Sequence, residues 1–172
     1  PQQIAGGEIY QALEKGIIDA AEWVGPYDDE KLGFNKVAKY YYTPGWWEGN
    51  APSLYLVNTK AWDSLPKEYQ NAFTAASAES NVLATAKYDQ LNPQALRRLI
   101  ASGVQLRTFS RELMDACYKA SMDQYAEWSD QNADFKRLYE SYSKFLDEQI
   151  SWFRVAESTF DNYMSYVKQK RK

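Results

Sequence analysis

The sequence predicts an α/β fold, and three observations support this prediction. Apolar side chains recur at helical spacing over residues 8–15 and over most of the chain from Pro66 onward. Short runs rich in β-branched and aromatic residues have the composition of strands. Gly16 and Gly103 each follow a helical pattern and precede an apolar run, as a left-handed residue that ends a helix does. Helices and strands therefore alternate along the chain, which is typical of a parallel sheet packed against helices.

The first third of the chain is expected to contain most of the strands. An apolar run at 17–21 follows the first helix and suits a buried strand of a parallel sheet. A helix with an acidic start is expected at 28–32. Two further strands are expected, one at 37–42 and one at 52–58.

The middle of the chain is expected to be mainly helical. A helical turn at 59–64 precedes a long helix that begins near Pro66, where the missing amide of proline is tolerated. Pro93 should break or kink this helix, because proline lacks the amide that continues the hydrogen-bond ladder. Residues 104–109 then alternate as a strand.

Two helices are expected to complete the chain, one from Ser110 to about Asn132 and one over 134–168. The final helix carries a wide apolar stripe that includes Phe135, Phe145 and Trp152. Such a stripe must be covered by protein to avoid a large exposed apolar patch. We expect this helix either to lie across its own chain as a spine or to pack against a second subunit.

Composition excludes several classes of function. The chain has 172 residues, with 20 Lys and Arg against 23 Asp and Glu, so its net charge of −3 provides no positive field for nucleic acid. With no His and only Cys117, it excludes an internal disulfide, a Cys/His zinc site and a Ser-His-Asp triad. No stretch approaches the ~18 uninterrupted apolar residues of a membrane helix. Because the chain starts at Pro1 without a signal segment, we expect a processed or truncated piece of a longer protein.

Two carboxylates are candidate ligand-binding groups. Glu22 follows the first expected strand and Glu48 follows the second, each next to a tryptophan. In open α/β sheets, ligands bind outside the carboxyl ends of the strands. Carboxylate and main-chain oxygens are the donors that sodium, magnesium and calcium prefer, so Glu22, the Trp23 carbonyl and Glu48 could together hold a hard cation.

Two other interpretations of these acids stay open, and the nearby aromatic clusters have alternatives of their own. Each acid could be an ordinary exposed loop residue, since strand-end acids are common on loops without a function. The two acids could also be a general acid/base pair of an enzyme, although no nucleophile stands near them in the sequence. The aromatic clusters at 40–42 and 46–47 could stack on a ligand or a partner, or simply pack within the fold.

Several motifs resemble one known family. They are GGEIYQALEKGIIDAAE at 6–22, GP at 25–26, YYTPGW at 41–46 and NTKAWDSLP at 58–66. In this order they resemble the solute-binding proteins of tripartite ATP-independent periplasmic (TRAP) transporters. EWVGP at 22–26 together with WWE at 46–48 is similar to the branch that binds 2-oxo or hydroxy acids with a metal ion.

The resemblance implies a periplasmic-binding-protein-like fold of two α/β lobes, a cleft between them and a long C-terminal helix. This chain would be the C-terminal part of that fold, and the N-terminal half would be a missing partner. Its segments would be a cleft-lining α/β part at 1–58, helices with one strand at 59–133, and the long helix at 134–172. The family's arginine that pairs with the substrate carboxylate would lie upstream of Pro1.

The resemblance also implies a function. The protein would be a periplasmic binding protein, not an enzyme, that captures a small, pyruvate-like 2-oxo monocarboxylate together with a monovalent or divalent cation for the TRAP membrane subunits. Sodium is the first expectation for that cation. Glu22, Glu48 and the Trp23 carbonyl would be its ligands, and Glu22, Trp47 and Glu48 would line the substrate pocket. A metal- or carboxylate-dependent enzyme acting on a small organic acid is the alternative. Some members of this branch exchange the final helix in a homodimer, which is our expectation here.

Overall fold

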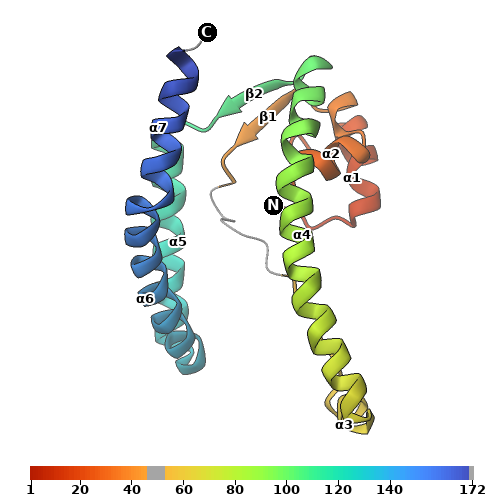
Figure 1. Ribbon diagram of the computed structural model, residues 1–172. Helices are drawn as coiled ribbons and strands as arrows, with labels where there is room; N and C mark the ends of the chain where they lie inside the picture. The colour runs from red at the N-terminus through yellow and green to blue at the C-terminus, as the bar shows by residue number, and fades with distance from the viewer. Residues whose placement is uncertain (46–52, 171–172) are drawn as a thin grey trace. The chain divides into compact units, whose positions relative to one another are not determined.

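A computed structural model describes residues 1–45 and 53–170 of the chain (Figure 1). These residues form two compact units, Pro1–Ser110 (unit 1) and Arg111–Lys172 (unit 2). The three segments expected from the sequence follow a different division, and they stay a prediction.

Unit 1 combines helices with a small parallel sheet. Its elements are α1 (Gly6–Glu14), α2 (Pro26–Lys31), the 3-10 helix η1 (Phe34–Lys36), β1 (Tyr40–Thr43), α3 (Thr59–Ser64), α4 (Lys67–Ala101) and β2 (Gln105–Thr108). The helices expected at 8–15, 28–32 and 59–64 are therefore confirmed, as is the strand within 104–109. The strand expected at 37–42 begins later, at Tyr40, because the amides of Val37 and Ala38 bond back to the Phe34 carbonyl of the 3-10 turn.

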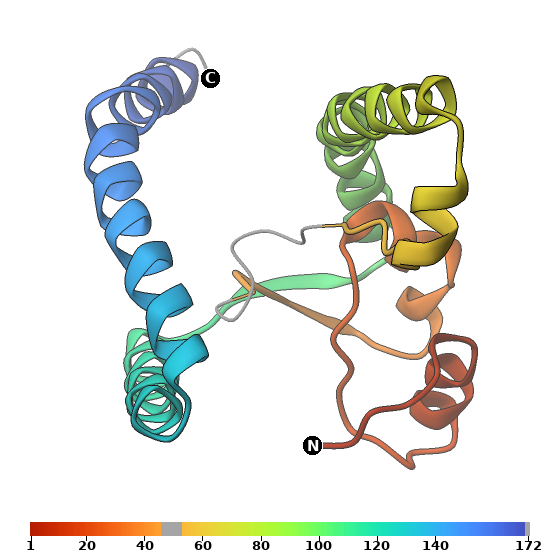
Figure 2. The ribbon, with the colours of Figure 1, turned by 90° about the horizontal axis from the view of Figure 1, so that it is seen from below.

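The sheet of unit 1 pairs two strands that are far apart in the sequence. β1 and β2 run parallel, in a register that extends from Tyr40 opposite Gln105 to Thr43 opposite Thr108. Figure 2 shows the two strands side by side. The long α4 lies between them in the sequence, as the crossover of a parallel pair requires. Gly103, with φ of +101°, ends the connection from α4 in a conformation that favours glycine.

The core of unit 1 is small and lies around α2, η1 and the C-terminal end of α4. Its buried apolar side chains are Ile9, Ala12, Phe34, Ala95, Leu99 and Val104. One charged residue, Asp29, is buried with them and is only 7% exposed.

Two of the expected strands are wrong. Residues 17–21 and 53–58 contain no strand, and Ile17 and Leu56 are 64% and 90% exposed. A strand needs a neighbouring strand to bond its backbone, and among the described residues only β1 and β2 pair. An apolar run can therefore have the composition of a strand and still form none, because it lacks a neighbouring strand for its backbone hydrogen bonds.

The expected break at Pro93 is also absent. α4 continues through Pro93 to Ala101, and α2 packs against it at this point. The Asn92 side chain accepts a hydrogen bond of 3.1 Å from the Tyr27 amide, and Leu99 is buried one turn and a half beyond the proline. We attribute the continuous helix to this packing, which offsets the cost of one lost backbone bond.

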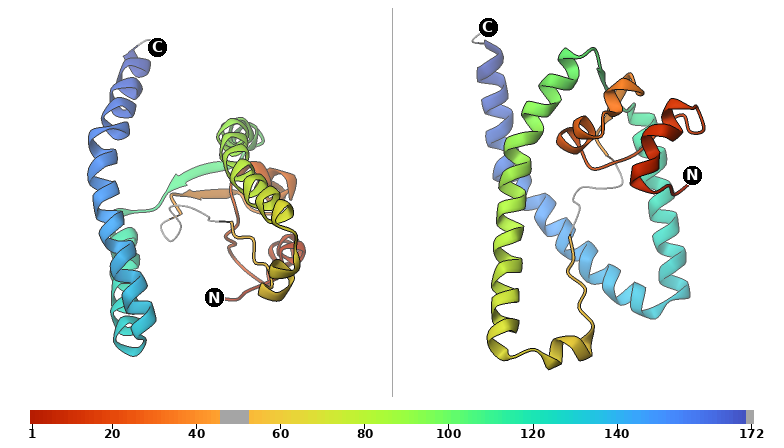
Figure 3. Two further views of the ribbon diagram at one scale, coloured as in Figure 1. Left: turned by 60° about the horizontal axis from the view of Figure 1, so that its bottom comes forward. Right: turned by 90° about the vertical axis from the view of Figure 1, so that its right-hand side faces the viewer.

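Unit 2 consists of three helices, α5 (Arg111–Gln131), α6 (Ala133–Val155) and α7 (Glu157–Lys170). α5 and α6 contact each other and diverge from the turn that joins them (Figure 3, right). Asn132 caps α6 by accepting a hydrogen bond of 3.0 Å from the Phe135 amide. The predicted helix that ends near Asn132 is thus confirmed.

The single helix expected over 134–168 is instead two helices. Ala156 separates them, with φ of −80° and ψ of −87° outside the helical range. The Thr159 hydroxyl donates to the Arg154 carbonyl at 2.8 Å, so a side chain replaces the backbone bond at this point. A periodic apolar stripe does not reveal such a local competition, because the stripe continues on both sides of it.

Candidate functional site

The segment between α1 and α2 carries two of the predicted ligands. Glu22 and Trp23 lie here in irregular backbone, and both are exposed. The Trp23 ring meets Phe34 edge-on, with centroids 6.5 Å apart. It also covers Gly6, where a Cβ atom would lie 2.5 Å from the ring. The tryptophan side chain is therefore held against unit 1, and glycine is the residue that fits beneath it.

The other predicted site residues, Trp47 and Glu48, lie outside the described residues. β1 ends at Thr43, shortly before them in the sequence, as expected. The described residues therefore do not test whether Glu22 and Glu48 lie close together. In residues 1–45 and 53–170 there is no group of three or more acidic or cysteine side chains that could hold a metal ion by itself. The described part of the site is therefore Glu22 and the Trp23 carbonyl alone.

The helix that follows this segment carries a buried carboxylate, Asp29, that the sequence analysis missed. The Tyr41 hydroxyl donates a hydrogen bond of 2.5 Å to Asp29 Oδ2. Burial raises the pKa of the Asp29 carboxyl, while the Tyr41 hydroxyl and the Gly25 amide act in the opposite direction. Burial and the neighbouring carboxylate likewise raise the pKa of Tyr41. Asp29 looks in the sequence like an ordinary acid in a first helical turn, and only its aromatic partner on β1 distinguishes it.

α2, which presents Asp29, is fixed to α4 by polar contacts along its length. Arg98 donates two hydrogen bonds to the Glu30 carboxylate, at 2.7 and 2.6 Å. These hydrogen bonds lower the pKa of Glu30. Tyr27 meets Tyr88 edge-on, with centroids 6.2 Å apart. The helix that follows Glu22 and Trp23 is therefore anchored at several points.

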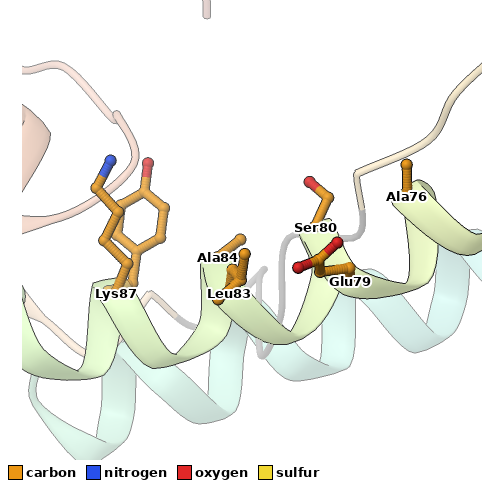
Figure 4. A pocket seen from close by; sticks show the side chains of 7 residues that line it. Ala76, Glu79, Ser80, Leu83, Ala84 and Lys87 are labelled. Atoms are coloured by element: carbon orange, nitrogen blue, oxygen red, sulfur yellow. The ribbon is translucent and has the colours of Figure 1, made fainter.

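The hollows on unit 1 do not coincide with the predicted ligands. One of about 370 Å³ runs along a single face of α4 (Figure 4). Its lining residues all belong to that helix: Ala76, Glu79, Ser80, Leu83, Ala84, Lys87 and Tyr88. A second, of about 20 Å³, lies beside Asp29 and Tyr41 among core side chains. The first hollow has walls from one helix only, whereas a small-molecule site usually takes walls from several elements. The second takes walls from several elements but is too small for an organic ligand.

None of the described helices combines enough length with enough apolar character to span a bilayer.

Comparisons with known proteins identify the family. Residues 1–132 match the family model described as bacterial extracellular solute-binding protein, family 7. A monocarboxylate 2-oxoacid-binding periplasmic protein from Nostoc sp. is 49% identical over 95% of this chain and 45% of its own length. A C4-dicarboxylate-binding periplasmic protein from Rhodobacter capsulatus is 30% identical over 60% of this chain and 30% of its own.

A solved structure gives the same result for the fold. A TRAP transporter solute-binding protein from Bordetella bronchiseptica is 53% identical and superimposes with a TM-score of 0.93 over all of this chain and 51% of that one. That protein is described as a mixed-occupancy dimer with copurified calcium and picolinate in one active site and an apo second site. The chain therefore spans about half the length of the Nostoc and Bordetella relatives.

These matches confirm the predicted fold class, a part of a two-lobe solute-binding fold, and the periplasmic location. They also decide between the two classes of function, because the matched relatives are binding proteins and not enzymes. The chain belongs to family 7 of the bacterial extracellular solute-binding proteins, the binding proteins of TRAP transporters.

Proposed function

We propose that the protein captures a small, pyruvate-like 2-oxo monocarboxylate together with a cation and delivers it to the membrane subunits of a TRAP transporter. The observation that carries this proposal is the 49% identity, over 95% of the chain, to a monocarboxylate 2-oxoacid-binding periplasmic protein. The identity to a C4-dicarboxylate-binding relative is lower and covers less of the chain. The comparison therefore favours a monocarboxylate as the substrate.

The proposed cation site consists of the Glu22 and Glu48 carboxylates and the Trp23 carbonyl. All three supply oxygen, which hard cations prefer. Two carboxylates also supply the charge that such a cation needs. Sodium is our first candidate, and calcium is the second because it copurified with the structural relative.

The chemistry of the relative's ligand supports a cation that also contacts the substrate. Picolinate carries a carboxylate next to a ring nitrogen, and a 2-oxo acid carries a carboxylate next to a keto oxygen. Both molecules can therefore present two neighbouring donor atoms to one cation. A bridging cation makes substrate and cation affinity depend on each other. Trp47 would form a wall of the same pocket.

The proposal is tested on the full-length protein by calorimetry. Pyruvate is titrated in the presence of sodium, of calcium, and after removal of divalent cations. Glu48→Gln and Glu22→Ala should each weaken pyruvate binding roughly 10- to 100-fold, since each removes a charged donor from the site. Both should weaken binding of the cation as well. Glu14→Gln, an exposed substitution at the end of α1, serves as the control and should bind like wild type.

Two results would contradict the proposal. Unchanged pyruvate affinity in Glu48→Gln, with no dependence of that affinity on added cation, would contradict the proposed cation site. Conversion of a bound 2-oxo acid into product by the full-length protein would favour the enzyme alternative. Because the side-chain amide introduced by Glu48→Gln could still coordinate through its oxygen, Glu22→Ala is the harsher of the two variants.

A further inference from the structure

Asp29 is the one buried charged side chain among the described residues, and its position needs an explanation. A carboxylate removed from water costs free energy unless hydrogen bonds replace its hydration. Here Oδ2 accepts from Tyr41, whereas Oδ1 is buried without a hydrogen-bond partner of ordinary geometry among the described residues. The carboxyl is therefore incompletely compensated, and an apolar side chain would stabilise this small core better.

The contacts of Asp29 join two segments that come from different parts of the fold. Its own amide donates to the Gly25 carbonyl at 2.9 Å, in the first turn of α2. Gly25 ends the irregular segment that carries Glu22 and Trp23. Tyr41 lies in the middle of β1, whose backbone is held by β2. The Asp29 carboxyl thus connects α2, which begins directly after the ligand-bearing segment, to the sheet.

This connection matters for a ligand that is a main-chain carbonyl. A side-chain ligand can change rotamer to reach a cation, whereas a carbonyl points wherever its backbone directs it. The backbone after Trp23 is held at Gly25 by α2, and the Trp23 ring is held by Phe34. The peptide whose carbonyl we assign to the cation lies between these two fixed points.

We propose that Asp29 and Tyr41 form a positioning pair that directs the Trp23 carbonyl toward the cation. This inference rests on the proposed function. Residues that surround the ligands of a metal site typically orient those ligands, and removing one such residue costs on the order of 10- to 100-fold in metal affinity.

The test uses the full-length protein and two nearly isosteric variants, Tyr41→Phe and Asp29→Asn. Calcium is titrated into protein freed of divalent cations, and pyruvate is titrated at low and at saturating calcium. Tyr41→Phe should weaken calcium binding about tenfold and reduce the enhancement of pyruvate binding by calcium. The double variant should be little worse than either single variant, because both remove the same contact. Tyr42→Phe is the control and should bind like wild type, because the exposed Tyr42 ring stacks on Phe109, just after β2, whereas the hydroxyl that bonds Asp29 is that of Tyr41.

The outcomes separate this inference from the proposed function. If Tyr41→Phe and Asp29→Asn lower the melting temperature but keep wild-type calcium affinity and calcium dependence, the pair is only structural and the inference is wrong. If wild-type protein itself binds pyruvate without any cation effect, the proposed cation site fails, and the positioning role fails with it. Should Asp29→Asn not fold, Tyr41→Phe alone decides, since it removes a single oxygen atom.

Discussion

Each of the two units of the described chain is stabilised internally by a different kind of contact. Unit 1 has a buried core and polar contacts between residues far apart in sequence, such as Asp29 with Tyr41 and Glu30 with Arg98. Unit 2 is held by rings near its turn, where Tyr125, Phe135 and Tyr139 meet at centroid distances between 5.0 and 6.4 Å. None of its described residues is buried.

This difference indicates separate tasks for the two units. In unit 1, contacts within the unit itself already hold the segment that carries Glu22 and Trp23. Unit 2 presents a largely uncovered apolar stripe, with Phe145, Trp152 and Phe160 each about 60% exposed. Such a surface requires cover from other parts of the protein or from a second copy. We therefore expect substitutions in unit 1 to change binding and substitutions in unit 2 to change assembly.

The largest expected effect is on assembly. Full-length protein truncated after Leu146 should shift from dimer to monomer in sedimentation velocity, because the removed residues carry the apolar stripe beyond Leu146. Truncation after Lys168, which keeps the apolar stripe, is the control. A dimer that survives the Leu146 truncation would exclude helix exchange and leave the spine arrangement within one chain.

A core substitution tests unit 1. Leu99→Ala should lower the free energy of unfolding of the full-length protein by about 3 kcal/mol, since Leu99 is 2% exposed and its loss leaves a cavity. Chemical denaturation measures this change. A cost under about 1 kcal/mol would mean that the core around α4 relaxes into the space.

The matching substitution in unit 2 is Phe145→Ala. Phe145 is 60% exposed in the described chain, but we expect a loss of about 3 kcal/mol in the full-length protein because its stripe is covered there. If the cover comes from a second copy, the loss will depend on protein concentration. A change in the free energy of unfolding within about 0.5 kcal/mol would instead show that the Phe145 ring stays in solvent. Unit 2 would then lack a covered apolar side chain at this position, in contrast to Leu99 in unit 1.

Helix caps give a smaller effect in both units. Asn132→Ala should cost about 1 kcal/mol, because it removes the side-chain acceptor at the start of α6. Asn58→Ala removes the corresponding cap of the short α3 and should cost less. Asn132→Asp preserves the acceptor and should keep wild-type stability in denaturant unfolding. Equal losses in Asn132→Ala and Asn132→Asp would mean that the cap is not the cause.

The smallest expected effect is the pH dependence of α2. The Arg98 hydrogen bonds lower the pKa of Glu30 below its usual 4.5, so the ionised form is the one that stabilises the fold. This contribution is present above pH 4.5 and is lost as the pH falls through the lowered pKa of the folded state. Glu30→Gln should therefore show a weaker fall in stability at acid pH than wild type, measured by urea unfolding over that range.

Asp29 provides the opposite sign in the same helix. Burial raises its pKa above the usual 3.8, so the folded state holds the proton more tightly than the unfolded state. Stability from this group is present below pH 3.8 and decreases as the pH rises toward the raised pKa. Asp29→Asn should remove that decrease, and an unchanged pH profile in both variants would show that neither carboxyl is coupled to folding.

The sequence by itself determined several of the helices and the family. Apolar spacing and caps predict α1, α3 and α5, because helical hydrogen bonds join residues three or four apart and need no distant partner. The motifs at 6–22 and 58–66 were enough to indicate a solute-binding protein. They also identified Glu22 and Trp23 as candidate ligands, since those residues belong to the motifs or directly follow them.

Only the tertiary structure decided the features that depend on distant partners. Residues 17–21 and 53–58 read as strands but form none, because a strand takes its hydrogen bonds from another part of the chain. Pro93 stays within a helix because α2 packs there. Asp29 reads as a surface acid but is buried, because α2, β1 and the end of α4 meet around it. The burial of a side chain and the pairing of a strand depend on which elements pack together, and no local pattern of residues encodes that packing.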